Sequence, residues 1–382
     1  MKVIVLGADG YLGWPTVLRL SSNGHDVIAV DNYLKRKVTE ELGVASLTPV
    51  PLLPERANAW KQSSGKNIEV KIGDVGDYDF LGDLVRMEQP QAIIHYAEQP
   101  SAPYSMMGQK AAALTLKNNL MTTLNVAYAV HEFAPDCHIV KLGTMGEYGT
   151  PNIDIEEGWL EVEHNGRKDK FLFPRQASSL YHTTKIQDTD LLWFYVRTWK
   201  LKVTDLMQGP VYGTFTEETN QDTSLEASFY YDEVFGTVVN RFVVQAVCGY
   251  PLTVYGNGTQ TRGYLDIRNT LDCVALAVDA PPVSGEMRVF NQITETFSVN
   301  EIAEKVKQVA KLFGIDVEIK NIENPREEKE NHYYNPKYSG LVDLGLKPQL
   351  MGDDNLSKIF ETALKYKEEI KQDVIFKGVK WK

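Results

Sequence analysis

The chain has 382 residues, of which 43% are hydrophobic and 24% are charged, and its formal net charge at pH 7 is −11. These values are ordinary for a globular protein, so they argue against a disordered chain, a collagen or a coiled coil. The acidic balance also argues against broad binding of nucleic acid, which needs a basic surface that displaces counterions.

The beginning of the chain predicts an intracellular protein. The first residues contain neither the apolar core of a signal peptide nor a transit segment rich in Ser and Arg, and no apolar run approaches the length of a membrane span. Cys137, Cys248 and Cys273 are widely spaced and odd in number, which favours buried thiols over a disulfide framework or a zinc site. We therefore expect a soluble, cytoplasmic protein with no membrane partner and no metal.

A glycine turn follows the first predicted strand, the apolar run at residues 2–6. Gly7 makes the tight bend, Gly10 lets the backbone approach a pyrophosphate, and Gly13 allows close packing of the helix that begins there. Asp31 ends the second strand, where its carboxylate is expected to accept hydrogen bonds from ribose hydroxyls and to repel a 2′-phosphate. The alternative is a structural turn with an unrelated acid, but the complete strand–turn–helix–strand context favours an NAD site.

Strands and helices alternate along the next part of the chain. Further strands are predicted at 26–30, 68–72, 92–96, 138–142 and 203–207. Helices are predicted near 78–88, 114–133 and 179–199. This alternation indicates an α/β fold with a doubly wound parallel sheet, the Rossmann fold. Asp74, which lies between Gly73 and Val75 at the end of the third strand, is expected either to contact adenine or only to shape a turn.

The character of the sequence changes near residue 215. Residues 1–215 are predicted to form the NAD-binding domain, with long insertions at 34–66 and 150–178 of the kind that often have a function. Residues 216–382 are predicted to form a smaller α/β lobe that binds substrate, with some segments returning to the Rossmann sheet. Helices are expected in this lobe near 298–313 and 355–370.

The spacing Tyr-x-x-x-Lys occurs three times, so the spacing alone means little. One occurrence begins at Tyr33, directly after the second strand, and another begins at Tyr333 and is interrupted by Pro336, which breaks a helix. Only Tyr181 and Lys185 open a long helical pattern. We therefore take this pair as the candidate for catalysis.

Positions i and i+4 of a helix share a face, so Lys185 is expected to lower the pKa of Tyr181 toward the working pH. The phenolate could then take a proton from a sugar hydroxyl while hydride leaves the same carbon. Thr144 lies just beyond the strand at 138–142 and is expected to orient the same substrate oxygen. Each residue alone would more often be structural, and only the joint arrangement favours chemistry.

This combination resembles the extended short-chain dehydrogenase/reductase superfamily, whose members modify nucleotide sugars. Longer stretches narrow the resemblance to the branch of the superfamily that forms UDP-sulfoquinovose. The matching stretches are 98–99, 101–106, 141–158, 176–179, 181–182, 251–256, 260–268, 288–292 and 332–335. Pro100 departs from the pattern, because this branch typically has an arginine there, near the substrate.

The resemblance implies that UDP-glucose and sulfite, or a protein that donates sulfite, give UDP-sulfoquinovose and water while NAD is recycled. Such enzymes are formally classed with hydrolases of carbon–sulfur bonds. Tyr181, assisted by Lys185, would deprotonate the 4-hydroxyl, and Thr144 would hydrogen-bond that oxygen. The resulting 4-ketone would acidify the C5 proton, after which water leaves from C6 and sulfite adds there.

Three further residues belong to the implied catalytic set. Glu147 is the candidate base for the C5 proton, although its position also suits a bystander carboxylate. His182 would protonate the leaving hydroxyl or help to hold sulfite, unless it is simply a packed histidine. Met145 lies between Thr144 and Glu147 in the matching stretch.

The resemblance also implies two sets of binding residues. For the cofactor, it adds to the glycine turn and its Tyr11 and Leu12 the residues Asn32, Arg36, Asn119 and Val211. For the UDP-sugar, it implies Gln208, Thr237, Asn240, Arg241, Leu252, Val254, Tyr255, Gln260, Arg262, Arg326 and Glu328. The arginines make chemical sense because guanidinium groups match pyrophosphate oxygens. Since every ligand is an anion, we expect the site to be a basic island in an acidic surface.

Two other functions remain open at this point. A UDP-glucose 4-epimerase or 4,6-dehydratase would share Thr144, Tyr181 and Lys185, but it would not need the insertion at 150–178 or a sulfite site. A non-catalytic NAD-sensing scaffold would usually lose the tyrosine or the lysine. Because the helices at 114–133 and 179–199 carry apolar surface and relatives typically pair there, we also expect a homodimer; the alternative is that both faces pack on their own sheet.

Overall fold

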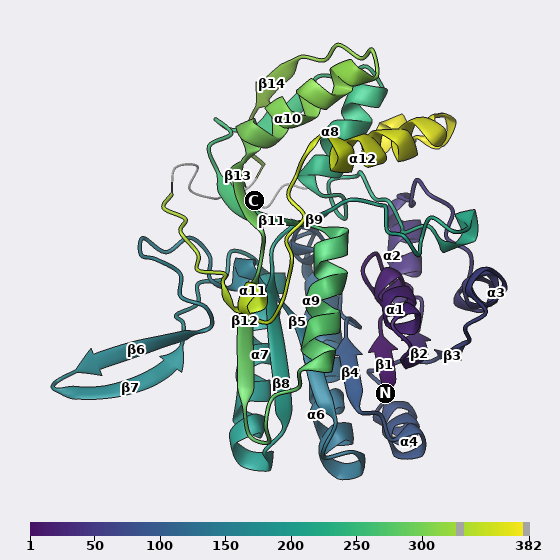
Figure 1. Ribbon diagram of the computed structural model, residues 1–382. Coiled ribbons are helices and arrows are strands. Elements are labelled where there is room, and N and C mark those ends of the chain that lie inside the picture. Colours follow the sequence, from purple (N-terminus) through teal and green to yellow (C-terminus); the bar gives the residue numbers. More distant parts are fainter. Residues whose placement is uncertain (326–331, 377–382) are drawn as a thin grey trace.

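The computed structural model describes residues 1–325 and 332–376. Its centre is a sheet of seven parallel strands in the order β12-β8-β5-β4-β1-β2-β3 (Figure 1). The strands are β1 (Lys2–Leu6), β2 (Asp26–Asp31), β3 (Ile68–Ile72), β4 (Ala92–His95), β5 (His138–Thr144), β8 (Lys202–Gln208) and β12 (Met287–Gln292). The predicted doubly wound parallel sheet is confirmed.

Helices cover both faces of this sheet (Figure 1). One layer contains α1 (Gly13–Ser22) and α9 (Ile267–Asp279), which contact each other. The other contains α4 (Tyr78–Glu88), α6 (Gln109–Phe133) and α7 (Leu180–Trp199), with α6 packed against both neighbours. Strands β1 and β4 are apolar along their length because both of their faces are covered.

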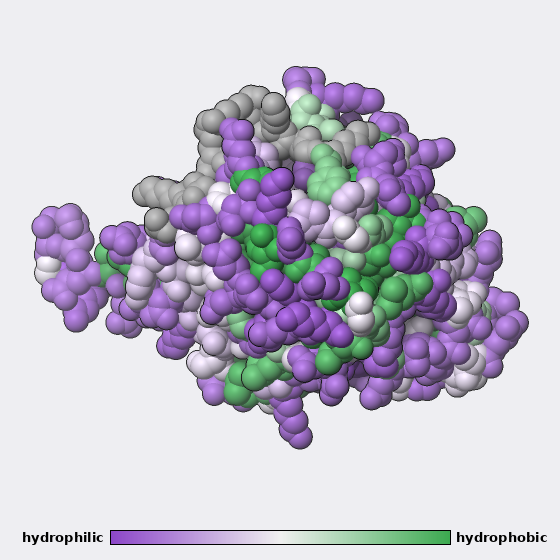
Figure 2. Space-filling view, turned by 90° about the horizontal axis from the view of Figure 1, so that it is seen from above, coloured by the Kyte–Doolittle hydropathy of each residue, from purple (hydrophilic) through white to green (hydrophobic). Residues whose placement is uncertain are grey.

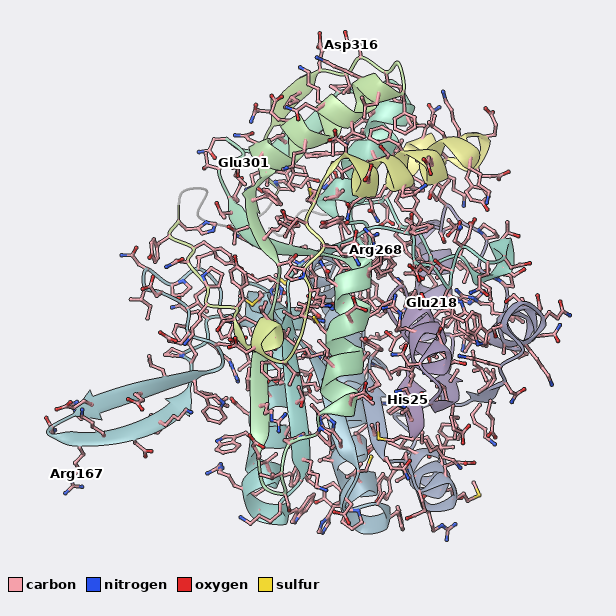
Figure 3. All side chains as sticks on the ribbon, viewed as in Figure 1. His25, Arg167, Glu218, Arg268, Glu301 and Asp316 are labelled. Carbon is pink, nitrogen blue, oxygen red and sulfur yellow. The ribbon has the colours of Figure 1, made fainter. Side chains whose placement is uncertain are left out.

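The two insertions have regular structure of their own. The first contains α2 (Leu34–Leu42) and α3 (Leu53–Ser64). The second contains the antiparallel hairpin β6 (Trp159–His164) and β7 (Arg167–Leu172), which stands away from the body with Arg167 at its tip (Figures 1 and 3). Seen from above, its surface is mostly hydrophilic (Figure 2).

The C-terminal part forms a lobe above the carboxyl ends of the sheet strands (Figure 1). Its strands are β9 (Val211–Tyr212), β10 (Leu252–Tyr255), β11 (Thr261–Asp266), β13 (Glu295–Ser298) and β14 (Ile319–Ile322). Its main helices are α8 (Val238–Val247), α10 (Val299–Leu312) and α12 (Asp353–Lys365). Phe242, Ile302 and Phe360 belong to one buried cluster between these elements, so the lobe has its own core.

The remaining elements are single turns. They are α5 (Ala102–Ser105), η1 (Met145–Glu147), η2 (Thr223–Leu225), α11 (Gly340–Asp343), η3 (Lys367–Glu369) and η4 (Gln372–Val374). Helix α9 contacts α1 and β5, and β12 is an edge strand of the Rossmann sheet, although both follow the lobe's first strands. The chain therefore crosses between the two parts more than once. The domain boundary at 215 stays a prediction. No helix in the described part of the chain is long and apolar enough to cross a membrane.

Candidate active site

Three glycines shape the turn between β1 and α1. Gly7 has φ +82°, and a Cβ there would come within 2.6 Å of the Tyr96 backbone. A Cβ on Gly13 would collide with the carbonyl oxygen of Gly7. Leu12 gives α1 no side-chain cap, Trp14 N–H donates to the Gly10 carbonyl at 3.2 Å, and Pro15 has no N–H. The N–H groups of Leu12 and Gly13 have no hydrogen-bond partner among the described residues and can bind an anion. This cradle fits the pyrophosphate of a dinucleotide.

A cavity lies at this turn, beside the ends of β2, β3 and β4. Of the residues expected to bind the cofactor, it is lined by Gly7, Gly10, Tyr11, Leu12, Gly13, Asp31, Asn32, Asp74 and Val75. Its ionisable lining consists of the carboxylates of Asp9, Asp31, Asp74 and Glu98, three tyrosines and a single cation, Lys35. The prediction of a basic island is therefore wrong for this part of the site. An anion here relies on backbone N–H groups.

Asp31 is placed as expected, but two backbone groups already use its oxygens. It accepts hydrogen bonds from the N–H of Asp9 at 2.9 Å and of Tyr33 at 2.6 Å. Burial raises the pKa of Asp31 to about 6. Arg36, expected at the cofactor, instead donates to both oxygens of Asp9 at 2.6 and 2.7 Å.

Two other cofactor residues do not line the cavity. Asn119 is buried between α6 and α7, where it accepts from the Gln99 N–H at 2.8 Å and donates to Thr184 Oγ1 at 3.0 Å. Val211 is buried in β9 and pairs with Leu265. In this structure both residues support the fold around the cavity, because packing turns their side chains away from it.

The C-terminal half of the chain contributes a part of the cavity wall that the sequence did not predict. Tyr230, Val234 and Phe235 line it together with Lys35 of α2. The Lys35 ammonium lies 4.0 Å from the centroid of the Tyr230 ring and 5.2 Å from that of Phe235. Burial lowers the pKa of Lys35 to about 8. No local pattern reveals this contact, because it joins segments far apart in the sequence.

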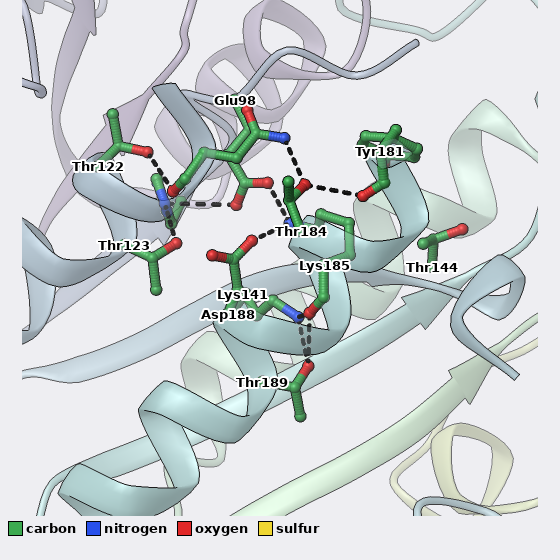
Figure 4. Close-up of polar contacts among 12 residues, drawn as sticks. Glu98, Thr122, Thr123, Lys141, Thr144, Tyr181, Thr184, Lys185, Asp188 and Thr189 are labelled. Atoms are coloured by element: carbon green, nitrogen blue, oxygen red, sulfur yellow. Dashed lines mark hydrogen bonds and ion pairs between the residues drawn. The ribbon is translucent and has the colours of Figure 1, made fainter. Parts of the chain in front are cut away.

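Thr144, Tyr181 and Lys185 come from the carboxyl end of β5 and the first turns of α7 (Figure 4). Lys185 Nζ donates a short hydrogen bond to Glu98 Oε2 and lies 3.7 Å from Asp188 Oδ2. No hydrogen bond between Lys185 Nζ and the Tyr181 hydroxyl occurs among the described residues. Neither Tyr181 nor Lys185 lines the cavity itself, whereas Glu98 does.

The pKa of Tyr181 is raised above its usual value, first by burial and then by the charges of Glu98 and Glu147. The expectation that Lys185 lowers this pKa is therefore wrong for the structure as it stands. The physical reason is first that the phenol is buried, which disfavours the phenolate, and second that the Glu98 and Glu147 carboxylates lie near it.

Glu147 is fully buried in a cluster of charges behind Thr144. Its Oε1 accepts from the Thr144 N–H at 3.2 Å and lies 3.5 Å from Lys141 Nζ. Its Oε2 lies 3.3 Å from Thr189 Oγ1 and 3.6 Å from Arg175 Nε. Burial raises the pKa of Glu147 in spite of these cations. The carboxylate does not line the cavity, so its role as a base stays a prediction.

His182 and Met145 lie close to the same turn. His182 Nδ1 is 3.0 Å from the hydroxyl oxygens of both Ser178 and Ser179. A Cβ on Gly146 would collide with His182 Nε2, so the imidazole packs directly against the turn that follows Thr144. Met145 is buried in this turn.

Several residues of the expected UDP-sugar set have buried polar atoms without a hydrogen-bond partner among the described residues. These atoms are Thr237 Oγ1, Asn240 Oδ1, Arg241 Nε and Nη2, and Gln260 Oε1. Thr237 and Asn240 also line the cavity. Because a buried polar group without a partner is costly, this group of atoms indicates a polar ligand.

The other members of that set have partners or lie elsewhere. Gln208 donates to Gln292 Oε1 at 3.1 Å, and Arg262 Nη1 lies 2.8 Å from His332 Nε2. Tyr255 lies under the Arg241 guanidinium, 4.8 Å from the ring centroid. Leu252 and Val254 are buried in the core of the lobe. Arg326 and Glu328 fall outside the described residues.

The sheet, the glycine turn and the uncapped helix start define an NAD-binding Rossmann protein. The model of the NAD dependent epimerase/dehydratase family matches residues 3–291. Solved structures with the same fold include the UDP-glucose 4-epimerases of Bifidobacterium longum, with a TM-score of 0.73 and 19% identity, and of Thermotoga maritima, with 0.71 and 20%. They cover 97% and 96% of this chain, which covers 100% and 99% of theirs.

Two curated proteins are similar to this chain over its whole length. The chloroplastic UDP-sulfoquinovose synthase of Spinacia oleracea is 48% identical over 381 residues, which are 100% of this chain and 79% of the spinach protein. The UDP-sulfoquinovose synthase of Sulfolobus acidocaldarius is 46% identical over 385 residues, 100% of this chain and 98% of the archaeal protein. The chain belongs to the NAD dependent epimerase/dehydratase family and, within it, to the UDP-sulfoquinovose synthases.

Proposed function

We propose that this protein makes UDP-sulfoquinovose and water from UDP-glucose and sulfite. The observation that carries the proposal is the identity of 48% and 46%, along the entire chain, to two enzymes of that name from a plant and an archaeon. The buried unpaired polar atoms around Arg241 support it, because a nucleotide sugar offers acceptors and donors to such groups.

The chain's own residues suit a tightly held dinucleotide. The N–H groups at the start of α1 would bind the pyrophosphate, Asp31 would accept from the ribose, and Asp74 and Val75 would contact adenine. NAD, when bound, supplies a hydride acceptor for C4 of the sugar and returns the hydride at the end.

Proton transfer falls to residues at the ends of β5 and α7. Tyr181 would take the proton of the 4-hydroxyl and later give it back, and Thr144 would hydrogen-bond the same oxygen. The 4-ketone weakens the C5–H bond, so the proton can pass to Glu147, whose carboxylate must first leave Lys141. His182 would then protonate the hydroxyl that leaves C6, after which sulfite adds to C6 and Glu147 returns its proton to C5.

We also propose a homodimer, formed through α6 and α7. Their outer faces expose Leu116, Met121, Tyr128 and Phe194, with fractional exposures between 36% and 49%. A patch of this kind on two adjacent helices is a common interface between copies. Light scattering should give the mass of a dimer, and Phe194→Glu should lower it; a monomeric mass for the parent would contradict the proposal.

The direct test is product analysis with UDP-glucose, with and without free sulfite. We expect a sulfonated UDP-sugar only when sulfite is present, and none from Tyr181→Phe. UDP-galactose as the sole product would refute the proposal in favour of an epimerase. Product that forms only when a sulfite-carrying protein replaces free sulfite would refute free sulfite as the donor. The cytoplasmic location stays a prediction, since one of the two relatives is named as chloroplastic.

A further inference from the structure

Glu98 is a buried carboxylate that none of the proposed steps uses. It follows β4 directly, lines the cavity, and has only 6% of its side chain exposed. Its Oε2 accepts the hydrogen bond from Lys185, and its Oε1 lies 3.4 Å from His95 Nε2 (Figure 4). The interaction joins β4 to α7 at the place where the catalytic lysine is needed.

The ionisable groups that face Lys185 and Tyr181 come from several elements. Besides Glu98 they are His95 of β4, Lys141 of β5, Glu147 of η1, and His182 and Asp188 of α7. Lys141 and Glu147 offset one another at 3.5 Å. The charges of these groups together set the electrostatic potential at the Tyr181 hydroxyl.

Burial shifts the pKa of two of these neighbours toward the uncharged form. Burial lowers the pKa of His95 to about 4, so its imidazole is uncharged. Burial also raises the pKa of Asp188 well above its usual value, and neither of its oxygens has a hydrogen-bond partner among the described residues. Glu98 is the carboxylate that accepts a hydrogen bond from the Lys185 ammonium, whereas Asp188 Oδ2 lies 3.7 Å from it.

We propose that Glu98 is a positioning residue of the reaction: by holding and compensating the Lys185 ammonium, it keeps the proton on the Tyr181 hydroxyl. The inference rests on the proposed acid–base role of Tyr181. The proton that is kept is the one that Tyr181 takes from the 4-hydroxyl, and the return of hydride to C4 requires Tyr181 to give this proton back to the sugar oxygen. Glu98 thus favours the return step over accumulation of the 4-ketone.

The first test is a titration of Tyr181 in the absence of substrate. Tyrosinate absorbance is measured for the parent and Glu98→Gln, and the Tyr181→Phe counterpart of each is subtracted to isolate Tyr181. We expect Glu98→Gln to ionise Tyr181 at a pH lower by roughly one unit or more, because the Lys185 ammonium near the phenolate is then no longer compensated. Glu98→Asp, which keeps the charge, should titrate like the parent. Equal titration of Glu98→Gln and the parent would overturn the proposal.

The second test asks whether Glu98 acts through Lys185. In a Lys185→Met background, Glu98→Gln should produce a much smaller shift than it does in the parent. A shift of undiminished size would overturn the positioning role. If Glu98→Gln alone does not fold, the double variant, which lacks both members of the buried ion pair, is compared with Lys185→Met, and a shift of about one unit between these two would overturn the positioning role.

A kinetic readout separates this role from a merely structural one. The acid limb of the pH profile for NADH formation with UDP-glucose should move to lower pH in Glu98→Gln. The matched control is Glu218→Gln, which removes a buried acid that pairs with Arg19 beside α1 (Figure 3) and should leave the profile unchanged. A uniform loss of rate in Glu98→Gln without a shift would overturn the proposal. Because the titration needs no turnover, its outcome is independent of whether sulfonated product forms.

Discussion

Two lysines, Lys141 of β5 and Lys185 of α7, are buried in the same site but differ in how many hydrogen-bond partners their ammonium groups have. Lys141 Nζ is held by Thr189 Oγ1 at 2.6 Å, Asp205 Oδ2 at 3.2 Å, the Lys185 carbonyl at 3.3 Å and Glu147 Oε1 at 3.5 Å. Lys185 Nζ has one hydrogen-bond partner among the described residues, Glu98 at the cavity wall.

The difference shows how a buried charge can be structural or available for chemistry. A cation whose donors are all used cannot turn to another group without leaving charges unpaired. A cation with one hydrogen-bond partner at a cavity wall still has donors for a ligand that enters the cavity. We therefore expect that replacing Lys141 mainly lowers the stability of the protein and that replacing Lys185 mainly lowers its activity.

The largest effect is expected from Lys141→Met. It leaves Asp205 and Glu147 buried without their shared cation, which should lower the free energy of unfolding by about 3–5 kcal/mol. Urea denaturation measures the change. Lys202→Met is the matched control, because Lys202 pairs with the exposed Asp136, and it should cost less than about 1 kcal/mol. Equal stability of Lys141→Met and Lys202→Met would contradict the structural role proposed for Lys141.

Lys185→Met should instead reduce the rate of NADH formation from UDP-glucose by at least about 100-fold, since proton transfer at Tyr181 loses its support. Its loss of stability should be smaller than that of Lys141→Met. Lys37→Met, in the unrelated Tyr33-x-x-x-Lys37 pattern, should retain the parent rate. A Lys185→Met enzyme with normal turnover would contradict the assignment.

The imidazole beside Glu98 should make stability depend on pH. The pKa of His95 is lowered to about 4 in the folded protein, so between pH 4 and 6.5 the unfolded chain binds a proton that the folded chain does not. Stability should therefore rise with pH across this window, by roughly 3 kcal/mol for this group. His95→Gln should flatten that rise in urea denaturation, and an unchanged slope would show that His95 does not cause it.

The smallest effect is expected from Thr189→Val, which removes the hydroxyl between Lys141 and Asp205. The loss should be about 1–3 kcal/mol, because buried polar groups lose a partner. Thr198→Val is the control on the same helix, since its exposed hydroxyl bonds only to the Phe194 carbonyl, and it should change stability by less than about 0.5 kcal/mol. Similar losses of stability in Thr189→Val and Thr198→Val would mean that the hydrogen bonds around Lys141 contribute little to the free energy of unfolding.

The sequence predicted what depends on local pattern. The apolar strands, the glycine turn and the helical spacing of Tyr181 and Lys185 are set within a few neighbouring residues, and the structure has the sheet and helix α7 where they were expected. Asp31, the acid predicted at the end of the second strand, also lines the cavity.

The sequence could not predict which charges pair across the fold. Lys141 lies in an apolar strand whose pattern does not show that Asp205 and Glu147 will surround it. Arg36 meets Asp9, and Lys185 meets Glu98, through packing of segments that are distant in the chain. These contacts leave the cavity acidic rather than basic, and burial of the Tyr181 phenol beside Glu98 raises its pKa rather than lowering it.

The most direct measurement is isotope analysis of the product formed from UDP-[4-²H]glucose and sulfite by the purified enzyme. Removal and return of the same hydride at C4, with Tyr181 exchanging the proton, predicts a sulfonated UDP-sugar that retains deuterium at C4 and is absent with Tyr181→Phe. A sulfonated product with protium at C4, or deuterated UDP-galactose without any sulfonated product, would contradict the account.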